Sequence, residues 1–165
     1  MKSLTFYTNM RQKTAISECH CKAFKRCFEF QHEARKIVPF KDKGRSTYIY
    51  INRSSAHLAK YRVDGCLMTD GVKCDYLLLN CEKKQAYFIE LKGSDVIHAI
   101  EQIDRSIDQL KSELPGFACF ARIVVTRVNT TNLEKNSKFL KLEKKVRSLN
   151  GNINKEKSGK FEETV

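Results

Sequence analysis

Two short apolar segments that carry charged side chains constrain this chain most: KCDYLLLN at residues 73–80 and QAYFIELKG at residues 85–93. A tight reversal between them pairs positions whose numbers sum to 165, which places Asp75 directly opposite Glu90. Glu90 and Lys92 are two residues apart, so they point to one face of a strand. Because both faces of the pair also carry apolar residues, we expect a central sheet that is covered on both sides.

The charged groups in this pair of strands need a chemical explanation. Asp75, Glu90 and Lys92 converge on an apolar sheet, where they carry a desolvation cost that a purely structural sheet would avoid. Cross-strand partners lie about 4.5–5.5 Å apart at Cβ, so the two carboxylates are close enough to share one divalent cation. The alternative interpretation is a buried ion triad without chemistry, which would contribute little to stability.

The segments before this pair predict a helix followed by strands. Apolar residues at roughly helical spacing predict a long basic helix over residues 14–37 that ends near Pro39. We expect a loop at 41–46. Three short elements should follow, in the order strand 47–51, helical turn 54–61 and strand 62–69, the last ending in a turn at Asp70-Gly71.

The segments after the pair predict a return to the sheet. Ser94 is a candidate N-cap for an amphipathic helix whose apolar residues recur every three or four positions from Val96 to Leu114. A buried strand is predicted at 121–128, and because it follows a helix we expect it to lie parallel to a neighbouring strand. A Lys-rich helix is predicted at 133–149.

Length and composition indicate one folded domain over residues 1–149 and a polar, disordered tail over residues 150–165. The seven cysteines are expected to be reduced thiols in a cytoplasmic protein, because the N-terminus lacks a signal-peptide pattern. No apolar run reaches the roughly 18–20 residues that span a bilayer, so no membrane partner is expected. A zinc site of Cys19, Cys21, Cys27 and His32 is an alternative, although this spacing matches no common zinc motif.

The net charge of +12 is unevenly distributed, with +10 in residues 1–63, −2 in 64–128 and +4 in 129–165. Basic flanks around a mildly acidic centre suit a protein that grips a polyanion and works on it with carboxylates. The alternatives are a solvated basic surface, or adhesion to ribosomes or to a membrane surface. The candidate nucleic-acid contacts are Lys22, Lys25, Arg26, Arg35, Lys36, Lys41, Lys43 and Arg45, with the Lys-rich C-terminal segment.

A motif in these segments resembles that of a known family. Asp75, a gap of 14 residues and then Glu90-Leu91-Lys92 resemble the signature of the PD-(D/E)XK nuclease superfamily, and Cys74 stands where the family often has Pro. The element order expected over residues 14–128 is similar to the restriction-endonuclease-like αβββαβ core of that superfamily, a mixed α/β fold with a central sheet flanked by helices.

The resemblance implies roles for particular residues. Asp75, Glu90 and the Leu91 carbonyl would hold Mg²⁺, with Mn²⁺ as a possible substitute, and Lys92 would lie near the attacking water or the scissile phosphate. It also implies an extra acid on the N-terminal helix, best placed at Glu33 with Glu29 one turn earlier, and a Gln near the site at Gln102. Two further carboxylates, Asp64 and Asp70, are rival metal ligands.

These observations predict a small Mg²⁺-dependent endonuclease that hydrolyses DNA, with DNA preferred over RNA through the resemblance alone. The usual settings of such enzymes are restriction, recombination, repair and defence. Because one active site cuts one strand, duplex cleavage would require a homodimer or a partner subunit. The alternative is a nucleic-acid-binding or accessory subunit of a larger complex that keeps the fold without the activity.

Overall fold

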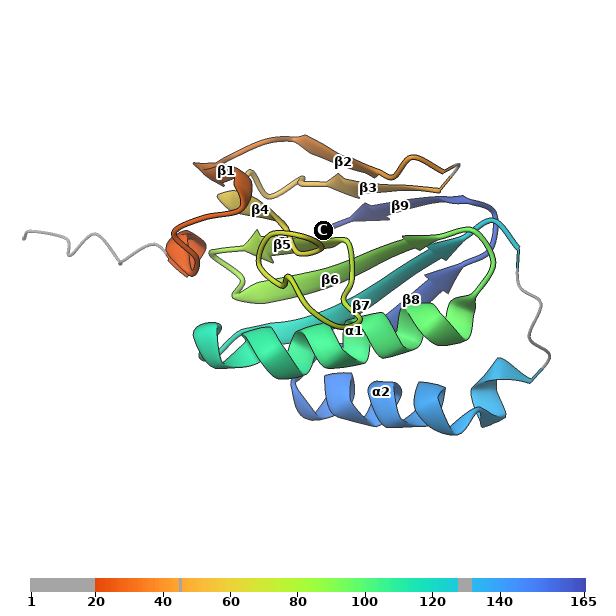
Figure 1. Cartoon of the computed structure of the whole chain (residues 1–165). Helices are drawn as coiled ribbons and strands as arrows, with labels where there is room; N and C mark the ends of the chain where they lie inside the picture. The colour runs from red at the N-terminus through yellow and green to blue at the C-terminus, as the bar shows by residue number, and fades with distance from the viewer. Residues whose placement is uncertain (1–19, 45, 128–131) are drawn as a thin grey trace, which may run out of the picture.

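The computed structural model describes residues 20–44, 46–127 and 132–165. Its elements form three layers, which are two helices, a six-stranded sheet and a three-stranded sheet (Figure 1). The large sheet has the order β1-β4-β5-β6-β7-β8, with β1 Phe28–Glu33, β4 Leu58–Arg62, β5 Tyr76–Asn80, β6 Gln85–Lys92, β7 Ala118–Val125 and β8 Ile153–Glu156. The small sheet has the order β2-β3-β9, with β2 Ile37–Lys41, β3 Thr47–Ile51 and β9 Lys160–Thr164.

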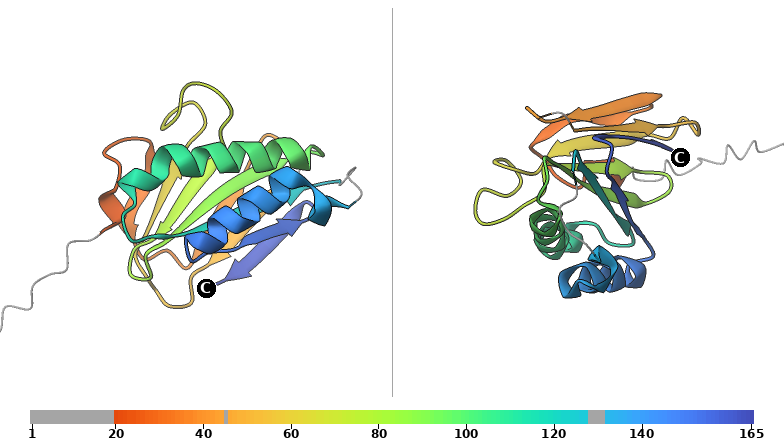
Figure 2. Two further views of the ribbon diagram at one scale, coloured as in Figure 1. Left: turned by 90° about the horizontal axis from the view of Figure 1, so that it is seen from below. Right: turned by 90° about the vertical axis from the view of Figure 1, so that its right-hand side faces the viewer.

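Both helices cover the face of the large sheet that lies away from the small sheet, as the two views of Figure 2 show. They are α1 Val96–Leu110 and α2 Ser137–Ser148, and short 3₁₀ turns lie at His20–Lys22, Lys111–Glu113 and Leu133–Lys135. One apolar core joins α1 and α2 to the sheet through residues such as Leu77, Phe88 and Ile103. A second core fills the space between the sheets, with Tyr48, Leu78 and Tyr87 among its members. The prediction of a sheet covered on both sides is confirmed.

The register of the β5–β6 pair is the predicted one. Tyr76 pairs with Ile89 and Asn80 pairs with Gln85, so that each pair of numbers sums to 165. Strand β4 runs antiparallel to β5. Strand β7 returns through α1 to lie parallel to β6, as expected. A slip of one residue would move every side chain to the opposite face and would exchange the members of the two apolar cores.

The predicted helix over residues 14–37 is wrong where the structure describes it. Residues 28–33 form β1, and Pro39 lies inside β2 rather than at the end of a helix. Alternate residues of β2 are buried, with Val38 and Phe40 inside, and this period of two requires a strand. The helical turn and the strand expected between 54 and 69 are replaced by β4 at Leu58–Arg62 and a long loop.

The disordered tail expected over residues 150–165 is also wrong, because this segment adds a strand to each sheet. Strand β8 pairs parallel with β7, and β9 pairs parallel with β3. Arg122 of β7, whose residue exposure is 2%, binds both carboxylate oxygens of Glu163 at 2.6 Å. The Tyr48 hydroxyl donates to the same carboxylate at 2.6 Å. Partners elsewhere in the chain therefore order a segment that is polar by itself.

The expectation of reduced cysteines is wrong for four of the seven. Disulfides join Cys21 to Cys81 and Cys27 to Cys66, whereas Cys74 and Cys119 are buried free thiols. The alternative zinc set is not assembled, because Cys21 and Cys27 belong to different disulfides and Cys19 lies outside the described residues. Among the described residues, no helix is long and apolar enough to cross a membrane.

Candidate active site

Asp75 and Glu90 meet where the loop after β4 enters β5. The Asp75 N–H donates to Glu90 Oε2 at 3.1 Å, and the Leu91 N–H donates to Asp75 Oδ2 at 2.8 Å. Lys92, two residues further along β6, holds its Nζ 3.5 Å from Glu90 Oε1. The structure thus brings together the three residues that the sequence singles out, and it does so through the backbone of two paired strands.

Burial makes negative charge costly at this point. It raises the pKa of Asp75 to about 6, with Asp42 and Asp64 adding repulsion, against the opposing effects of the Leu91 N–H and of Lys92. It raises the pKa of Glu90 to about 8, where Asp75 adds repulsion and Lys92 opposes it. Two carboxylates whose charges are disfavoured, side by side, form a place where a cation would be stabilised.

Gln102 extends this group from helix α1. Lys92 Nζ donates to Gln102 Oε1 at 2.9 Å, and Gln102 Nε2 donates to the Lys73 carbonyl at 2.7 Å. The helix begins immediately after β6, with Asp95 rather than the expected Ser94 as its N-cap. This short connection places Gln102, two turns into the helix, beside the end of β6. Gln102 therefore links the Lys92 ammonium to the loop that carries Asp75.

Two residues of α1 that sequence reasoning missed hold the same loop. Ser106 Oγ accepts from the Cys74 N–H at 2.9 Å. Arg105 Nη1 donates to the carbonyls of Asp70 at 2.7 Å and Val72 at 3.0 Å. The loop projects beside α1, as Figure 2 shows. The sequence does carry a signal for Ser106. Gln102 and Ser106 are polar, lie four positions apart and fall on the buried, otherwise apolar side of the helix.

An open cleft of about 430 Å³ leads to Asp75. The turn between β2 and β3 forms one wall, and the segment that follows β4 forms another. The residues that line the cleft are Lys41, Asp42, Lys43, Arg62, Asp64, Gly65, Asp75 and Tyr76. The β2–β3 turn is anchored beside the site, because Tyr76 Oη donates to the Lys41 carbonyl at 3.0 Å and Ser46 Oγ donates to the Lys92 carbonyl at 2.8 Å.

The other predicted acids lie elsewhere or have different partners. Glu33 pairs with Leu58 across the sheet, at the end of β4 remote from Arg62, and its carboxylate binds Arg35 at 2.6 Å. The structure therefore does not bring Glu33 to the site, since the helix expected to carry it is a strand. Glu29 binds Lys60 at 2.7 Å.

Of the two rival ligands, one lies on the cleft and the other does not line it. Asp64 lines the cleft, where its carboxylate lies 3.3 Å from Lys73 Nζ. Asp70 instead binds Arg105, at 3.2 Å. Within the described ranges, no group of three or more His, Cys, Asp or Glu side chains is arranged to hold a metal ion. A metal at this site would therefore have two carboxylates, Asp75 and Glu90, as its side-chain ligands.

The predicted nucleic-acid contacts separate into groups. Lys41 and Lys43 line the cleft, whereas Arg35 and Lys36 lie at the opposite end of β2. The remaining described members, Lys22, Lys25 and Arg26, precede β1. The start of β1 lies near the end of β4, because the Arg62 N–H donates to the Cys27 carbonyl at 2.8 Å. Arg45 lies outside the described residues. Arg62, which the sequence did not single out, joins the cleft group.

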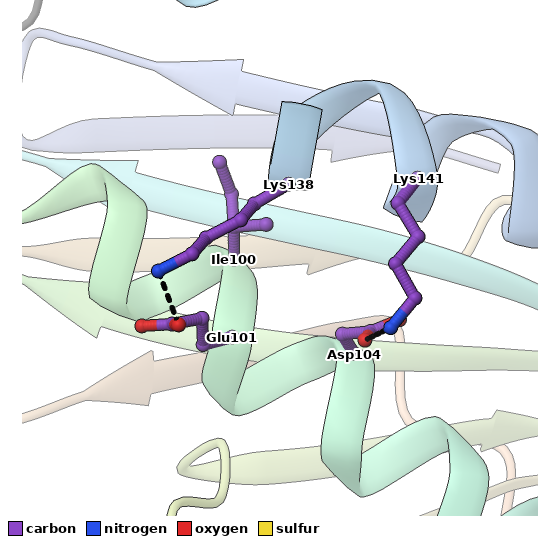
Figure 3. Close-up of a pocket in the computed structure, with 5 residues that line it drawn as sticks. All are labelled: Ile100, Glu101, Asp104, Lys138 and Lys141. Carbon is purple, nitrogen blue, oxygen red and sulfur yellow. Dashed lines mark hydrogen bonds and ion pairs between the residues drawn. The ribbon is translucent and has the colours of Figure 1, made fainter. Parts of the chain in front are cut away.

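A second, smaller pocket lies between α1 and α2 (Figure 3). Each of its acids already has a basic partner. Glu101 binds Lys138 at 2.5 Å, and Asp104 binds Lys141 at 2.9 Å as well as Lys145. These ion pairs connect the two helices. The carboxylates of this pocket are therefore already paired with lysines of the neighbouring helix. Asp75 in the cleft, in contrast, makes no ion pair with another described residue.

No family model matches the chain, and neither a curated protein nor a solved structure matches it. The fold and the site define a mixed α/β protein with a carboxylate pair, a lysine and a glutamine at the mouth of a charged cleft.

Proposed function

We propose that this protein is a Mg²⁺-dependent nuclease of the PD-(D/E)XK type that hydrolyses phosphodiester bonds in DNA. One observation carries the proposal. Asp75, which directly precedes β5, and Glu90 of the adjacent antiparallel strand β6 are hydrogen-bonded into one group, and Lys92 lies 3.5 Å from Glu90. This is the constellation that the motif resemblance requires, and a purely structural sheet has no evident need for it.

The arrangement of elements around the site gives further support. Strands β4, β5 and β6, helix α1 and strand β7 follow one another as βββαβ, with β7 parallel to β6. This is the order expected after the first helix of the family core. That first helix has no counterpart in residues 20–37, and residues 1–19 lie outside the described part of the chain.

The donor set fits a hard divalent cation. Mg²⁺ is usually held by one or two protein carboxylates together with water. Asp75 and Glu90 supply the carboxylates, and their raised pKa values reflect burial and mutual repulsion that a cation would offset. The Leu91 carbonyl is a further candidate ligand, because Leu91 directs its N–H towards Asp75. When bound, the metal would activate a water and offset the charge of the transition state.

The chain's own residues would orient the reaction. Lys92 is held between Glu90 and Gln102, so its ammonium is positioned to orient the attacking water or to stabilise charge on the phosphate. Gln102 is a positioning residue, because it acts through Lys92 and through the Lys73 carbonyl. The cations of the cleft would hold flanking phosphates.

The test is an incubation of purified protein with supercoiled plasmid, linear duplex, single-stranded DNA and RNA in Mg²⁺, Mn²⁺ or chelator. Asp75→Asn and Lys92→Ala are run beside Lys83→Ala, a control at an exposed position in the turn between β5 and β6, at the end of β5 remote from Asp75. The proposal expects metal-dependent cleavage by the wild type and the control, and loss in both site variants. Equal cleavage by all four proteins would indicate a contaminant. No cleavage with salt-sensitive binding retained would favour the non-catalytic binding subunit.

A further inference from the structure

Both walls of the cleft are fixed to the sheet. The wall at residues 62–66 is tied to β1 by the Cys27–Cys66 disulfide and by the bond from the Arg62 N–H to the Cys27 carbonyl. Its base is fixed by the Val63 N–H, which donates to the Asp75 carbonyl at 2.9 Å. The opposite wall is anchored through Tyr76 and Ser46, as described above. The width of the cleft is therefore set by covalent and hydrogen bonds.

The size of the cleft limits what reaches the carboxylates. The cleft is open to solvent, and its volume of about 430 Å³ lies within the roughly 300–1,000 Å³ range of sites that bind one small ligand. Glu90 is 1% exposed, so a phosphate has to enter the cleft to approach it. The cleft therefore suits a group of about the size of one nucleotide.

The lining of the cleft suits the two parts of a nucleotide. Lys41, Lys43 and Arg62 are exposed, and none of them makes an ion pair with another described residue, so their charges remain for phosphates. Asp42, Asp64 and Asp75 also line the cleft, so the lining holds three cations and three carboxylates, and Lys73 lies beside Asp64. A cation bound at Asp75 would leave the lining with an excess of positive charge.

One lining residue is aromatic. The Tyr76 ring contacts Phe40 edge-on, with 5.4 Å between centroids, and Lys60 Nζ lies 5.0 Å from its centre. These contacts and its hydroxyl bond to the Lys41 carbonyl fix the ring in place. Aromatic side chains beside cationic groups are a usual means of holding single-stranded nucleic acid, because every base has a π-face.

We propose that the cleft binds one unpaired nucleotide of a DNA strand, with its base against Tyr76 and its flanking phosphates against Lys41, Lys43 and Arg62. Single-stranded DNA, or a duplex opened at the cut position, is then the preferred substrate. The preference in cleavage rests on the proposed nuclease function. The preference in binding does not depend on it.

Fluorescence anisotropy in chelator tests the binding directly, using a labelled 20-nucleotide single strand and the matching duplex. We expect the single strand to bind at least 10-fold more tightly. In the triple variant Lys41→Ala/Lys43→Ala/Arg62→Ala, the slope of log affinity against log salt should fall by about 2, since each phosphate contact on a single strand contributes about 0.7. Lys83→Ala, in the exposed turn between β5 and β6, should keep the wild-type slope. Equal affinity for duplex and single strand, or an unchanged slope in the triple variant, would overturn the proposal.

Substitutions of Tyr76 test the stacking. Tyr76→Ala should weaken single-strand binding about 10-fold, whereas Tyr76→Phe, which keeps the ring and loses only the hydroxyl bond to the Lys41 carbonyl, should weaken it less. If Tyr76→Ala does not fold, Tyr76→Leu keeps an apolar contact with Phe40 and still lacks a ring. Equal binding by the Phe variant and by the ring-less variant would contradict the stacking.

The same oligonucleotides in Mg²⁺ separate the two proposals. Absence of cleavage with a single-strand preference in binding would refute the nuclease and leave the cleft assignment standing. Cleavage of both substrates at one rate would refute the substrate preference and leave the nuclease standing. Equal binding and cleavage of an RNA strand would extend the preference to unpaired nucleic acid in general and overturn its restriction to DNA.

Discussion

The backbone N–H of Asp75 donates to the carboxylate of Glu90, while the carboxylate of Asp75 accepts from the N–H that follows Glu90. Each acid is therefore held by the backbone of the other's strand. The separation between the two carboxylates is set by the β5–β6 register rather than by side-chain freedom. Rearrangement of the site would require a break in the pairing of two central strands.

The Glu90→Gln variant should change how stability depends on pH. The pKa of Glu90 is raised from 4.5 to about 8, so between these values the folded chain keeps a proton that the unfolded chain has lost. In chelator, wild-type stability should therefore fall as the pH rises from 6 to 8. Glu90→Gln should show a flatter profile and higher stability at pH 8. Urea midpoints at three pH values measure this, and parallel profiles for the two proteins would contradict it.

Gln102→Ala should slow cleavage by roughly 10- to 100-fold, as is usual when a residue that orients a functional group is removed. The substitution takes away the acceptor of Lys92 Nζ and leaves the Lys73 carbonyl without its amide donor. Affinity for single-stranded DNA in chelator should stay within about 2-fold, because Gln102 does not line the cleft. Gln102→Glu, which keeps an acceptor for Lys92, should recover part of the rate. Equal rates for the Ala variant and the wild type would remove Gln102 from the site.

Glu163→Ala should destabilise the fold by about 3–5 kcal/mol, the usual cost of a buried charge that loses its partner. Arg122 would remain buried without its two carboxylate contacts, and Tyr48 would lose its acceptor. The double variant Arg122→Met/Glu163→Leu removes both charges and should lose less. Urea unfolding of the three proteins measures the difference. A loss below about 1 kcal/mol in Glu163→Ala would argue against the docking of β9.

Removal of the Cys27–Cys66 disulfide should cost about 4 kcal/mol by the chain-entropy relation for a loop that spans 39 positions. It should also weaken single-strand binding, because Cys66 follows the cleft residues Asp64 and Gly65. Cys27→Ser/Cys66→Ser is compared with the wild type in urea, with and without reductant. Reductant should destabilise the wild type more than the variant. A wild type that is insensitive to reductant would contradict both disulfides.

The core of the site was predictable because it depends on local pattern. The two apolar runs at 76–80 and 85–92 and the short reversal between them determine the pairing, and the pairing places Asp75, which directly precedes β5, beside Glu90. The helical seam that starts at Val96 likewise determines α1. Its short connection to β6 brings Gln102 to Lys92.

The remaining parts depend on partners that a local pattern does not reveal. Residues 28–33 lie within a stretch of helix-compatible spacing, yet they form a strand that pairs with β4. The polar residues 153–164 form strands because β7 and β3 offer hydrogen bonds and because Arg122 binds Glu163. The disulfides join cysteines 39 and 60 positions apart, and residue spacing alone gives no means of pairing them.

The parallel pairing of β3 with β9 joins Thr47 to Lys160 and Ile51 to Thr164, positions more than 100 residues apart in the chain. During synthesis, β2 and β3 emerge long before β9, the third strand of the small sheet. The β2–β3 turn forms one wall of the cleft, and β3 has no partner on its other side until residue 164 has left the ribosome. Contacts of such long range slow folding. The carboxylate pair is therefore expected to assemble first from its short hairpin, and the cleft that leads to it should be completed only after translation of this region.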